Sequence, residues 1–319
     1  MAPDLSAVSP LTVPAGLAET VGAAGPEGVR WIRDLPARVD ELLRRWELAV
    51  DGQLRHGHVA LVVPVRRLTG EPAALKVGWP HPEAEPEAAA LRAWAGRGAV
   101  RLLDHDAEAW ALLLERLDPD HDLDSLPDVE GACDEAALLL PALHAVDPPD
   151  EVPLVADLAR DWEEHLLGRW ERAHAPFPRR RAEEARELAG VLPAEGPVRL
   201  LHWDLHLANV LAVPGTEADP EGRWRAIDPK PLAGDPAAEA LALLRNRDEA
   251  WAAASDPPAA IRGRLARVCE SGGLDPDRAR AWALLRAVVD HVGAAREGRT
   301  ADARVLDALA AALATPRAF

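Results

Sequence analysis

Two aspartates and an asparagine in the middle of the chain have the residue types and spacing of a phosphate-transfer site. Asp204 lies in L-L-H-W-D-L-H-L-A-N, which ends at Asn209, and Asp228 follows the short apolar run 224–227. Because the ends of neighbouring strands meet at one edge of a small sheet, we expect the three side chains to converge. Carboxylate and amide oxygens suit Mg²⁺, and H-x-D-x-x-x-x-N followed by an isolated aspartate is typical of phosphotransfer. The spacing predicts Asp204 as the catalytic residue, receiving or orienting a hydroxyl proton, and Asn209 and Asp228 as metal ligands.

The same segment also permits a transition-metal site. His202, Asp204 and His206 form H-x-D-x-H, and imidazole nitrogens bind zinc or iron. A metal hydrolase would need further His or Cys ligands, and the other histidines form no second ligand pair. It would also leave Asn209 and Asp228 without a role, so the pattern favours magnesium.

A lysine and a glutamate in the first third of the chain have the types needed to hold a nucleotide. Lys76 lies in A-A-L-K-V, close to the V-A-I-K pattern that delivers a lysine to nucleotide phosphates. Glu87 lies in a helix expected from about Pro86 and shares its inward face with Leu91 and Trp94. The pattern therefore predicts a lysine–glutamate pair.

Lysine is scarce in this chain. Of 36 basic residues only Lys76 and Lys230 are lysines, as expected if arginine has replaced lysine in a GC-biased genome. A retained lysine can mark a place where a compact ammonium is needed. Chance survival explains Lys230 equally well and Lys76 less well.

The first third of the chain is predicted to be rich in strands. A loosely structured arm, with at most a short helix near Leu17–Val21, precedes a helix from Asp34 to Trp46. The segment 51–58 contains two glycines and is longer than a hairpin needs, so it could lie over phosphates; an ordinary hairpin loop is an equal alternative. Strands are expected at 47–50, 59–65, 73–79, 100–103 and 110–114.

The remainder of the chain is predicted to be mainly helical. The change follows the polar residues Glu115–Asp118, where we place a hinge. Short strands at 198–201, 210–213 and 224–227 carry the proposed site. Helices are expected at 129–146 (bent or broken at Pro141), 154–173, 180–192, 236–252, 258–271, 276–296 and 301–314.

This distribution indicates an α+β chain with two lobes and a ligand-binding cleft. Residues 1–117 would form an N-terminal arm, a helix and a nucleotide-binding small lobe. Residues 118–319 would form a helical lobe with the catalytic loop and the substrate site. Glu115, where the hinge begins, joins Lys76 and Glu87 as a predicted nucleotide-binding residue.

The composition excludes several classes of partner. The 53 acids against 36 bases give a net charge of -17, which opposes binding to nucleic acid or an anionic membrane and would attract a cationic small-molecule substrate. Cys133 and Cys269 form no CxxC, so neither a disulfide framework nor a cysteine-based zinc site is expected. No signal peptide or membrane-spanning run is visible, and the expected location is the cytoplasm. The oligomeric state cannot be inferred from these features.

The chain resembles the aminoglycoside phosphotransferase family, and within it the streptomycin 6-kinase and hydroxyurea phosphotransferase branch. The resemblance implies a protein-kinase-like fold with a small antiparallel-sheet lobe and a larger helical lobe. It also implies ATP with Mg²⁺ and phosphorylation of a small hydroxylated antibiotic, for this branch the 6-hydroxyl of the streptidine ring of streptomycin. It runs from about Trp31 to Arg247 and rests on the order and spacing of A-A-L-K-V, E-A-A-A-L-R-A-W-A-G-R-G-A-V-R-L-L, A-L-L-L-E-R-L, L-L-H-W-D-L-H-L-A-N-V-L and A-I-D-P-K-P-L-A-G-D-P-A-A-E.

Three features depart from the family pattern. Trp203 stands where the family usually has glycine, Ala238 and Glu239 stand where relatives have Tyr and Asp, and segment 51–58 is poor in Gly, Ser and Thr. An acidic stretch at 157–164 could line a pocket for a cationic substrate, although a solvated helix face explains it at least as well.

Two other functions fit the same residues. One is a kinase of another metabolite, such as an amino sugar or hydroxyurea. The other is a non-catalytic nucleotide-binding protein, which would normally have lost the lysine or one of the acids; all are retained here.

Overall fold

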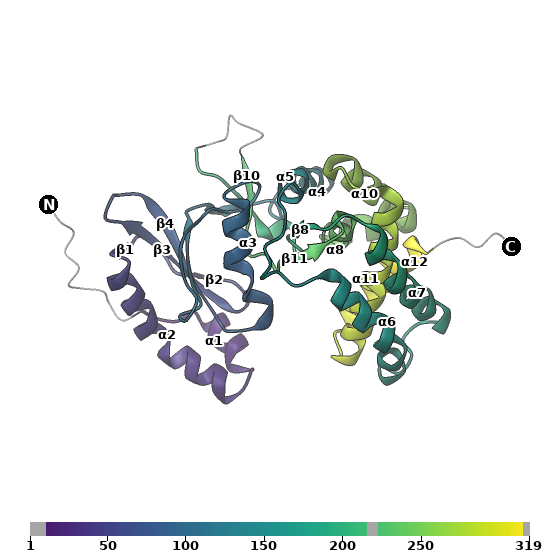
Figure 1. Ribbon diagram of the computed structural model, residues 1–319, viewed down its shortest axis with the longest axis horizontal. Helices are drawn as coiled ribbons and strands as arrows, with labels where there is room; N and C mark the ends of the chain where they lie inside the picture. Colours follow the sequence, from purple (N-terminus) through teal and green to yellow (C-terminus); the bar gives the residue numbers. More distant parts are fainter. Residues whose placement is uncertain (1–10, 216–222, 315–319) are drawn as a thin grey trace. The chain divides into compact units, whose positions relative to one another are not determined.

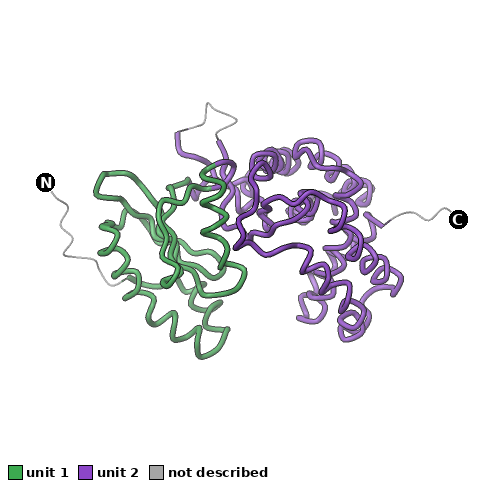
Figure 2. Tube along the Cα trace, viewed as in Figure 1, with its two compact units in different colours: residues 1–96, 100–117 green, residues 97–99, 118–319 purple. Residues whose placement is uncertain are grey.

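The computed structural model describes residues 11–215 and 223–314 and divides the chain into two compact units (Figures 1 and 2). Unit 1 consists of Met1–Gly96 and Val100–Leu117, and unit 2 of Arg97–Ala99 and Asp118–Phe319. None of the described helices is long and apolar enough to cross a bilayer.

Unit 1 is built on an antiparallel sheet. The strands run in the order β1-β3-β4-β6-β5, and β2 also pairs with β3. Side chains alternate between the two faces, so Leu75 and Val77 of β4 are buried in the core while Lys76 points to the opposite face. The strands are β1 Leu48–Val50, β2 Arg55–His56, β3 Ala60–Arg67, β4 Pro72–Gly78, β5 Leu102–Asp106 and β6 Ala111–Glu115.

Helices α1 (Ala15–Gly22) and α2 (Pro26–Arg45) contribute their apolar residues to the core on one face of this sheet. The prediction that the second helix begins at Asp34 was wrong, because α2 begins at Pro26 and Pro36 lies inside it. The earlier start has a local signal, because Pro26 lies in the first turn, where its fixed φ suits a helix. A Cβ added to Gly28 would lie 1.9 Å from the carbonyl oxygen of Val21, so a glycine is needed where the two helices meet.

The segment predicted as a long glycine-bearing loop is mostly an interrupted edge strand. Strands β1 and β2 pair one after the other with β3, and only residues 51–54 separate them. The turn into β3 is tight, with the Gly57 N–H donating to the Ala60 carbonyl at 2.9 Å. The segment therefore forms a hairpin with β3, and its placement over phosphates stays a prediction.

Unit 2 contains two small antiparallel sheets. One has the order β10-β9-β7, made of β7 (Asp118–Asp122), β9 (Val210–Ala212) and β10 (Trp224–Ala226), and the other pairs β8 (Arg199–Leu201) with β11 (Leu232–Gly234). Two of the three predicted central strands, β9 and β10, share a sheet as expected, but the strand predicted at 198–201 does not, because β8 pairs with β11. Strands β7 and β11 were not predicted, because D-P-D-H-D and L-A-G carry no apolar alternation.

The rest of unit 2 is helical. Helix α11 is buried on all sides, with Trp282, Leu285 and Val288 each at most 1% exposed, and it forms the centre of this unit. The predicted break near Pro141 is confirmed by the division between α4 and α5. The helices are α4 Val129–Ala137, α5 Leu140–His144, α6 Val155–Arg172, α7 Arg179–Glu195, α8 Ala240–Arg245, α9 Asp248–Ala252, α10 Pro257–Gly272, α11 Pro276–Arg296 and α12 Thr300–Leu313.

Candidate active site

The pairing of β9 with β10 brings the predicted metal residues Asn209 and Asp228 together, and backbone hydrogen bonds tie the loop of Asp204 to the same segment. The N–H of Ile227 donates to the carbonyl oxygen of Asn209 at 2.8 Å, which places Asp228 next in sequence to a partner of Asn209. The N–H of Lys230 donates to the carbonyl oxygen of His202 at 3.1 Å. The segment after β10 is thus tied to both ends of the loop that carries Asp204.

His202 supports this loop from beneath. Its side chain is fully buried, and Nε2 lies 3.0 Å from the carbonyl oxygen of Ile227. Burial lowers the pKa of His202 below its ordinary value, so the imidazole is neutral near pH 7. His202 therefore acts as a structural link between the two segments.

Asp204 and Asn209 are oriented toward different tasks. The Asn209 amide nitrogen donates to the backbone carbonyl of Asp204 at 3.0 Å, so its amide oxygen is the side-chain atom suited to a cation. Asn209 is buried, whereas the Asp204 side chain is 30% exposed, with one oxygen 3.2 Å from Nζ of Lys230. Asp228 lies at the surface with φ of 54°.

The side-chain oxygens of Asn209 and Asp228 fit Mg²⁺ better than zinc. An amide oxygen and an aspartate are hard oxygen ligands. Within residues 11–215 and 223–314, no three side chains of the His, Cys, Asp and Glu types are grouped so that they could hold a metal ion. The H-x-D-x-H alternative therefore finds no support in the described part of the chain.

Glu239 anchors the catalytic loop. It is 1% exposed and accepts the backbone N–H of His202 at 2.5 Å and that of Trp203 at 3.1 Å. Burial alone would raise the pKa of Glu239, but contacts with His144, His202 and the Trp203 N–H outweigh it and hold the pKa below its ordinary value. The carboxylate is therefore ionised, and the glutamate replaces the family aspartate without losing the anchor.

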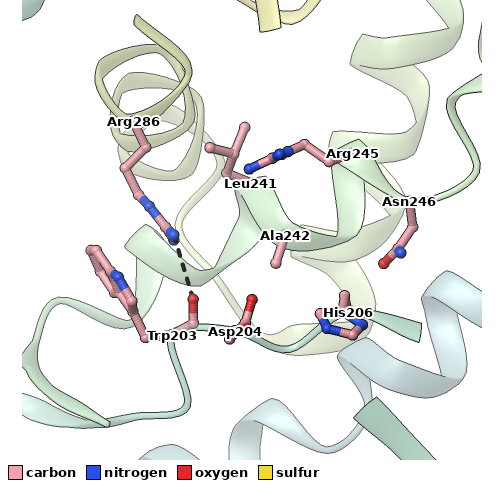
Figure 3. Close-up of a pocket in the computed structure, with 8 residues that line it drawn as sticks. All are labelled: Trp203, Asp204, His206, Leu241, Ala242, Arg245, Asn246 and Arg286. Atoms are coloured by element: carbon pink, nitrogen blue, oxygen red, sulfur yellow. Dashed lines mark hydrogen bonds between the residues drawn. The ribbon is translucent and has the colours of Figure 1, made fainter. Parts of the chain in front are cut away.

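Trp203 adopts a backbone conformation that favours glycine. Its φ is 67°, in the left-handed region, where a side chain costs about 1–3 kcal/mol. The guanidinium carbon of Arg286 lies 3.8 Å from the centre of the indole ring, and Arg286 also donates to the Trp203 carbonyl (Figure 3). Arg286 donates a further hydrogen bond to the Ala238 carbonyl. This stack offsets the strain and explains how tryptophan is accommodated.

A pocket of about 280 Å³ adjoins the Asp204 carboxylate within unit 2 (Figure 3). It is the candidate acceptor pocket. Arg245, which lines the pocket, forms an ion pair with Asp290 at 3.3 Å. It is lined by Trp203, Asp204, His206, Leu241, Ala242, Arg245, Asn246 and Arg286.

A helix break shapes one wall of the pocket. The prediction of a single helix over 236–252 was wrong, because α8 ends at Arg245 and Arg247 has φ of 44°. The break directs the Asn246 side chain to the catalytic loop, where its oxygen accepts the Leu207 N–H at 3.0 Å. Arg264 donates to the Asn246 carbonyl at 2.5 Å and holds the break in place.

The acidic stretch 157–164 is not part of this lining. Asp157 pairs with Arg160 at 2.9 Å and Asp161 with Arg169 at 2.6 Å, all within α6. Local pairing of this kind is typical of a solvated helix face.

The residues predicted to bind nucleotide lie in unit 1. Nζ of Lys76 is 2.7 and 2.8 Å from the two carboxylate oxygens of Glu87, and the two side chains are only 12% and 6% exposed. The Glu115 carboxylate accepts the Arg101 N–H at 2.7 Å, so it also fastens the edge of β5.

Sequence reasoning did not include four residues around Asp204 in the site. The scarcity of lysine pointed to Lys230. Nothing local pointed to Arg245, Asn246 or Arg286, because they lie far from Asp204 in sequence and reach it only through helix packing.

The two-unit architecture is the fold of the protein-kinase-like phosphotransferases, as the resemblance predicted. The solved structure of choline kinase LicA from Streptococcus pneumoniae matches with a TM-score of 0.55 at 14% identity, covering 87% of this chain and 99% of that chain. At this identity the likeness concerns the fold alone.

Two curated relatives are far more similar in sequence. Streptomycin 6-kinase of Streptomyces griseus is 39% identical over 313 residues, which cover 98% of this chain and 100% of the relative. Hydroxyurea phosphotransferase of Kitasatospora aureofaciens is 40% identical over 295 residues, which cover 91% and 82%. The family model of the aminoglycoside/hydroxyurea antibiotic resistance kinases matches residues 45–298. The chain belongs to this family and is an enzyme of the kinase class.

Proposed function

We propose that this kinase transfers the γ-phosphate of ATP, with Mg²⁺, to a hydroxyl group of streptomycin or a close relative. The observation that carries the proposal is the partly exposed Asp204 carboxylate at the edge of a pocket, beside the buried and oriented Asn209 amide. The Streptomyces griseus relative, whose name is streptomycin 6-kinase, supports the choice of acceptor because the match spans its whole length.

Each proposed residue has a task in this reaction. Asp204 receives the proton of the acceptor hydroxyl as the oxygen attacks the γ-phosphorus. Asn209 and Asp228 would hold Mg²⁺, which when bound neutralises charge on the phosphates. Lys76, fixed by Glu87, would hold the phosphates of the nucleotide.

In this proposal the two units have different roles, one in binding the nucleotide and the other in catalysis and acceptor binding. We assign the nucleotide to residues 1–117, where Glu115 would contact it near the start of the hinge, and catalysis and the acceptor to residues 118–319. ATP use makes the cytoplasm the proposed location, and the excess of acids makes nucleic acid or an anionic membrane an unsuitable partner.

Hydroxyurea is a second candidate acceptor, and the similarity to one relative supports it. The relative named hydroxyurea phosphotransferase is as similar in identity as the streptomycin kinase. A small uncharged acceptor is also compatible with a pocket whose lining contains two arginines and one carboxylate.

The deciding experiment measures ADP release with streptomycin, other aminoglycosides, amino sugars and hydroxyurea as separate acceptors. The product is identified by mass spectrometry. Streptomycin should stimulate release most, and the Asp204→Asn variant should lose the stimulation while still binding nucleotide. Stimulation by hydroxyurea but not by streptomycin would transfer the assignment to the second class. Nucleotide binding without transfer to any acceptor would favour a binding protein.

A further inference from the structure

Lys230 lies beside the proposed catalytic carboxylate. Its Nζ is 3.2 Å from Oδ2 of Asp204, and the two side chains are 42% and 30% exposed. The backbone bond from Lys230 to the His202 carbonyl fixes the start of the side chain. The ammonium is therefore held next to the acceptor site by the same buried histidine that supports the catalytic loop.

The composition points independently to this residue. Arginine fills every basic position of the chain except two, and both lysines contact a carboxylate of the proposed site: Lys76 contacts Glu87, and Lys230 contacts Asp204. The difference between a lysine ammonium and an arginine guanidinium explains why arginine would not serve at position 230. A guanidinium tends to engage both oxygens of a carboxylate, whereas an ammonium can bind one oxygen and turn another N–H toward a second anion.

We propose that Lys230 is a catalytic residue of phosphoryl transfer. Its ammonium donates one hydrogen bond to Asp204, and it donates another to an oxygen of the phosphoryl group while that group passes to the acceptor. The inference rests on the proposed function and adds to it a cation in unit 2 that acts on the group in transit. Negative charge on the transferred group is spread over its three equatorial oxygens, and a preorganised cation stabilises that charge.

The step balances without a further reactant. The acceptor oxygen forms a bond to the γ-phosphorus, and the bond from that phosphorus to the bridging oxygen breaks, with its electron pair leaving on ADP. The acceptor proton passes to Asp204. Lys230 gains and loses no proton, so its contribution is purely electrostatic.

A purely structural role for Lys230 predicts different kinetics. If Lys230 only neutralised Asp204, its removal would alter stability or binding and leave kcat nearly intact. In the catalytic role, Lys230→Met lowers kcat about 100-fold or more, the loss typical of one removed charge-stabilising group. KM values for nucleotide and acceptor stay within a few-fold. Lys230→Arg keeps the charge but not the geometry, and it recovers only a minor part of kcat.

Chemical rescue gives the sharpest test. The K230C variant is alkylated with 2-bromoethylamine, the thiolate displacing bromide, so that an ammonium returns on a thioether arm of similar length. The native thiols of Cys133 and Cys269 are buried, and burial raises the pKa of each to about 11, so they react slowly. Mass spectrometry should show one adduct on the variant and none on the parent.

We expect the amine adduct to raise kcat of K230C at least 10-fold. Alkylation with iodoacetamide leaves a neutral arm of similar size and should restore nothing, and the parent treated with either reagent keeps its activity. Equal rescue by both reagents, or a Lys230→Met variant with more than a third of the parental kcat, would overturn the catalytic role.

The proposed function and the role of Lys230 fail in distinguishable ways. If the parent phosphorylates no acceptor of the panel, the comparison uses its ATP hydrolysis, in which water is the acceptor. An unchanged hydrolysis rate in Lys230→Met then refutes the role of Lys230 alone. A parent that binds ATP but neither hydrolyses nor transfers it refutes both.

Discussion

The chain contains two lysine–carboxylate pairs that are alike in chemistry and opposite in burial. In unit 1, Lys76 and Glu87 are 12% and 6% exposed and meet at 2.7 Å. In unit 2, Lys230 and Asp204 are 42% and 30% exposed and meet at 3.2 Å. A buried pair cannot lose one partner without leaving an uncompensated charge, whereas an exposed pair can exchange partners with water or substrate. The first pair is therefore suited to holding a fixed cation, and the second to taking part in a reaction.

The largest expected effect comes from breaking the exposed pair at its acid. Asp204→Asn should lower kcat about 1,000-fold, because it removes the group that receives the acceptor proton. Stability should change by less than about 1 kcal/mol, since exposed ion pairs contribute little. Steady-state kinetics and urea unfolding measure the two quantities. A variant that is inactive because it is unfolded would contradict the contrast between the pairs.

Breaking the buried pair should, in contrast, lower the stability of the fold strongly. Glu87→Ala leaves the Lys76 ammonium buried without its main partner, so the free energy of unfolding should fall by about 3–5 kcal/mol. A matched control is Glu71→Ala, which removes an exposed partner of Arg67 in the same unit and should cost at most about 1 kcal/mol. Equal losses in urea unfolding would show that burial does not distinguish the pairs.

The buried Glu239 anchor extends the comparison to pH. Its pKa is depressed in the folded state, so its contribution to stability is complete above the ordinary value of 4.5 and is lost as the pH falls through the lower folded pKa. Burial lowers the pKa of His202, so His202 stays neutral in the folded state, and this lowers stability progressively as the pH falls below its ordinary pKa of 6.5. Glu239→Gln should reduce the loss below pH 4.5, to which Asp106 and Asp161 with their lowered pKa values also contribute, and leave the decline that begins near 6.5. The free energy of unfolding, measured from pH 3 to 8, checks both declines. An unchanged decline below pH 4.5 in Glu239→Gln would show that Glu239 does not contribute to it.

The smallest effect concerns the backbone at Trp203. With φ of 67°, alanine at this position keeps the strain and loses the stack on Arg286, whereas glycine loses the stack and relieves the strain. Trp203→Gly should therefore be more stable than Trp203→Ala by about 1 kcal/mol. The same pair of substitutions at an exposed helical position such as Arg160 in α6 should give the opposite order, because glycine is the poorer helix former. Alanine more stable than glycine at 203 would contradict the strained conformation.

The fold class and the family could be predicted from the sequence because they depend on local signals. Alternation in A-A-L-K-V, the helical spacing after Pro86 and the H-x-D-x-x-x-x-N segment each lie within about ten residues, where spacing fixes which side chains share a face. Element boundaries failed where a distant contact decided them. The helix predicted from 236 breaks at Asn246, whose side chain bonds to Leu207, whereas the earlier start of α2 has a local signal in Pro26.

The sequence by itself determined the chemical groups of the proposed site: an aspartate predicted to be catalytic, side-chain oxygens predicted to bind a hard cation, and two lysines retained among arginines. The tertiary structure decided how these groups are held. Arg286 reaches Trp203 across 83 residues of sequence and Asn246 reaches Leu207 across 39, while Glu239 supplies the anchor beneath the loop. Spacing along the chain cannot encode such contacts, because they depend on how separate helices pack against the loop. The backbone bond from Lys230 to His202, next to the pairing of β11 with β8, places Lys230 beside Asp204, and no local pattern could have assigned it that partner.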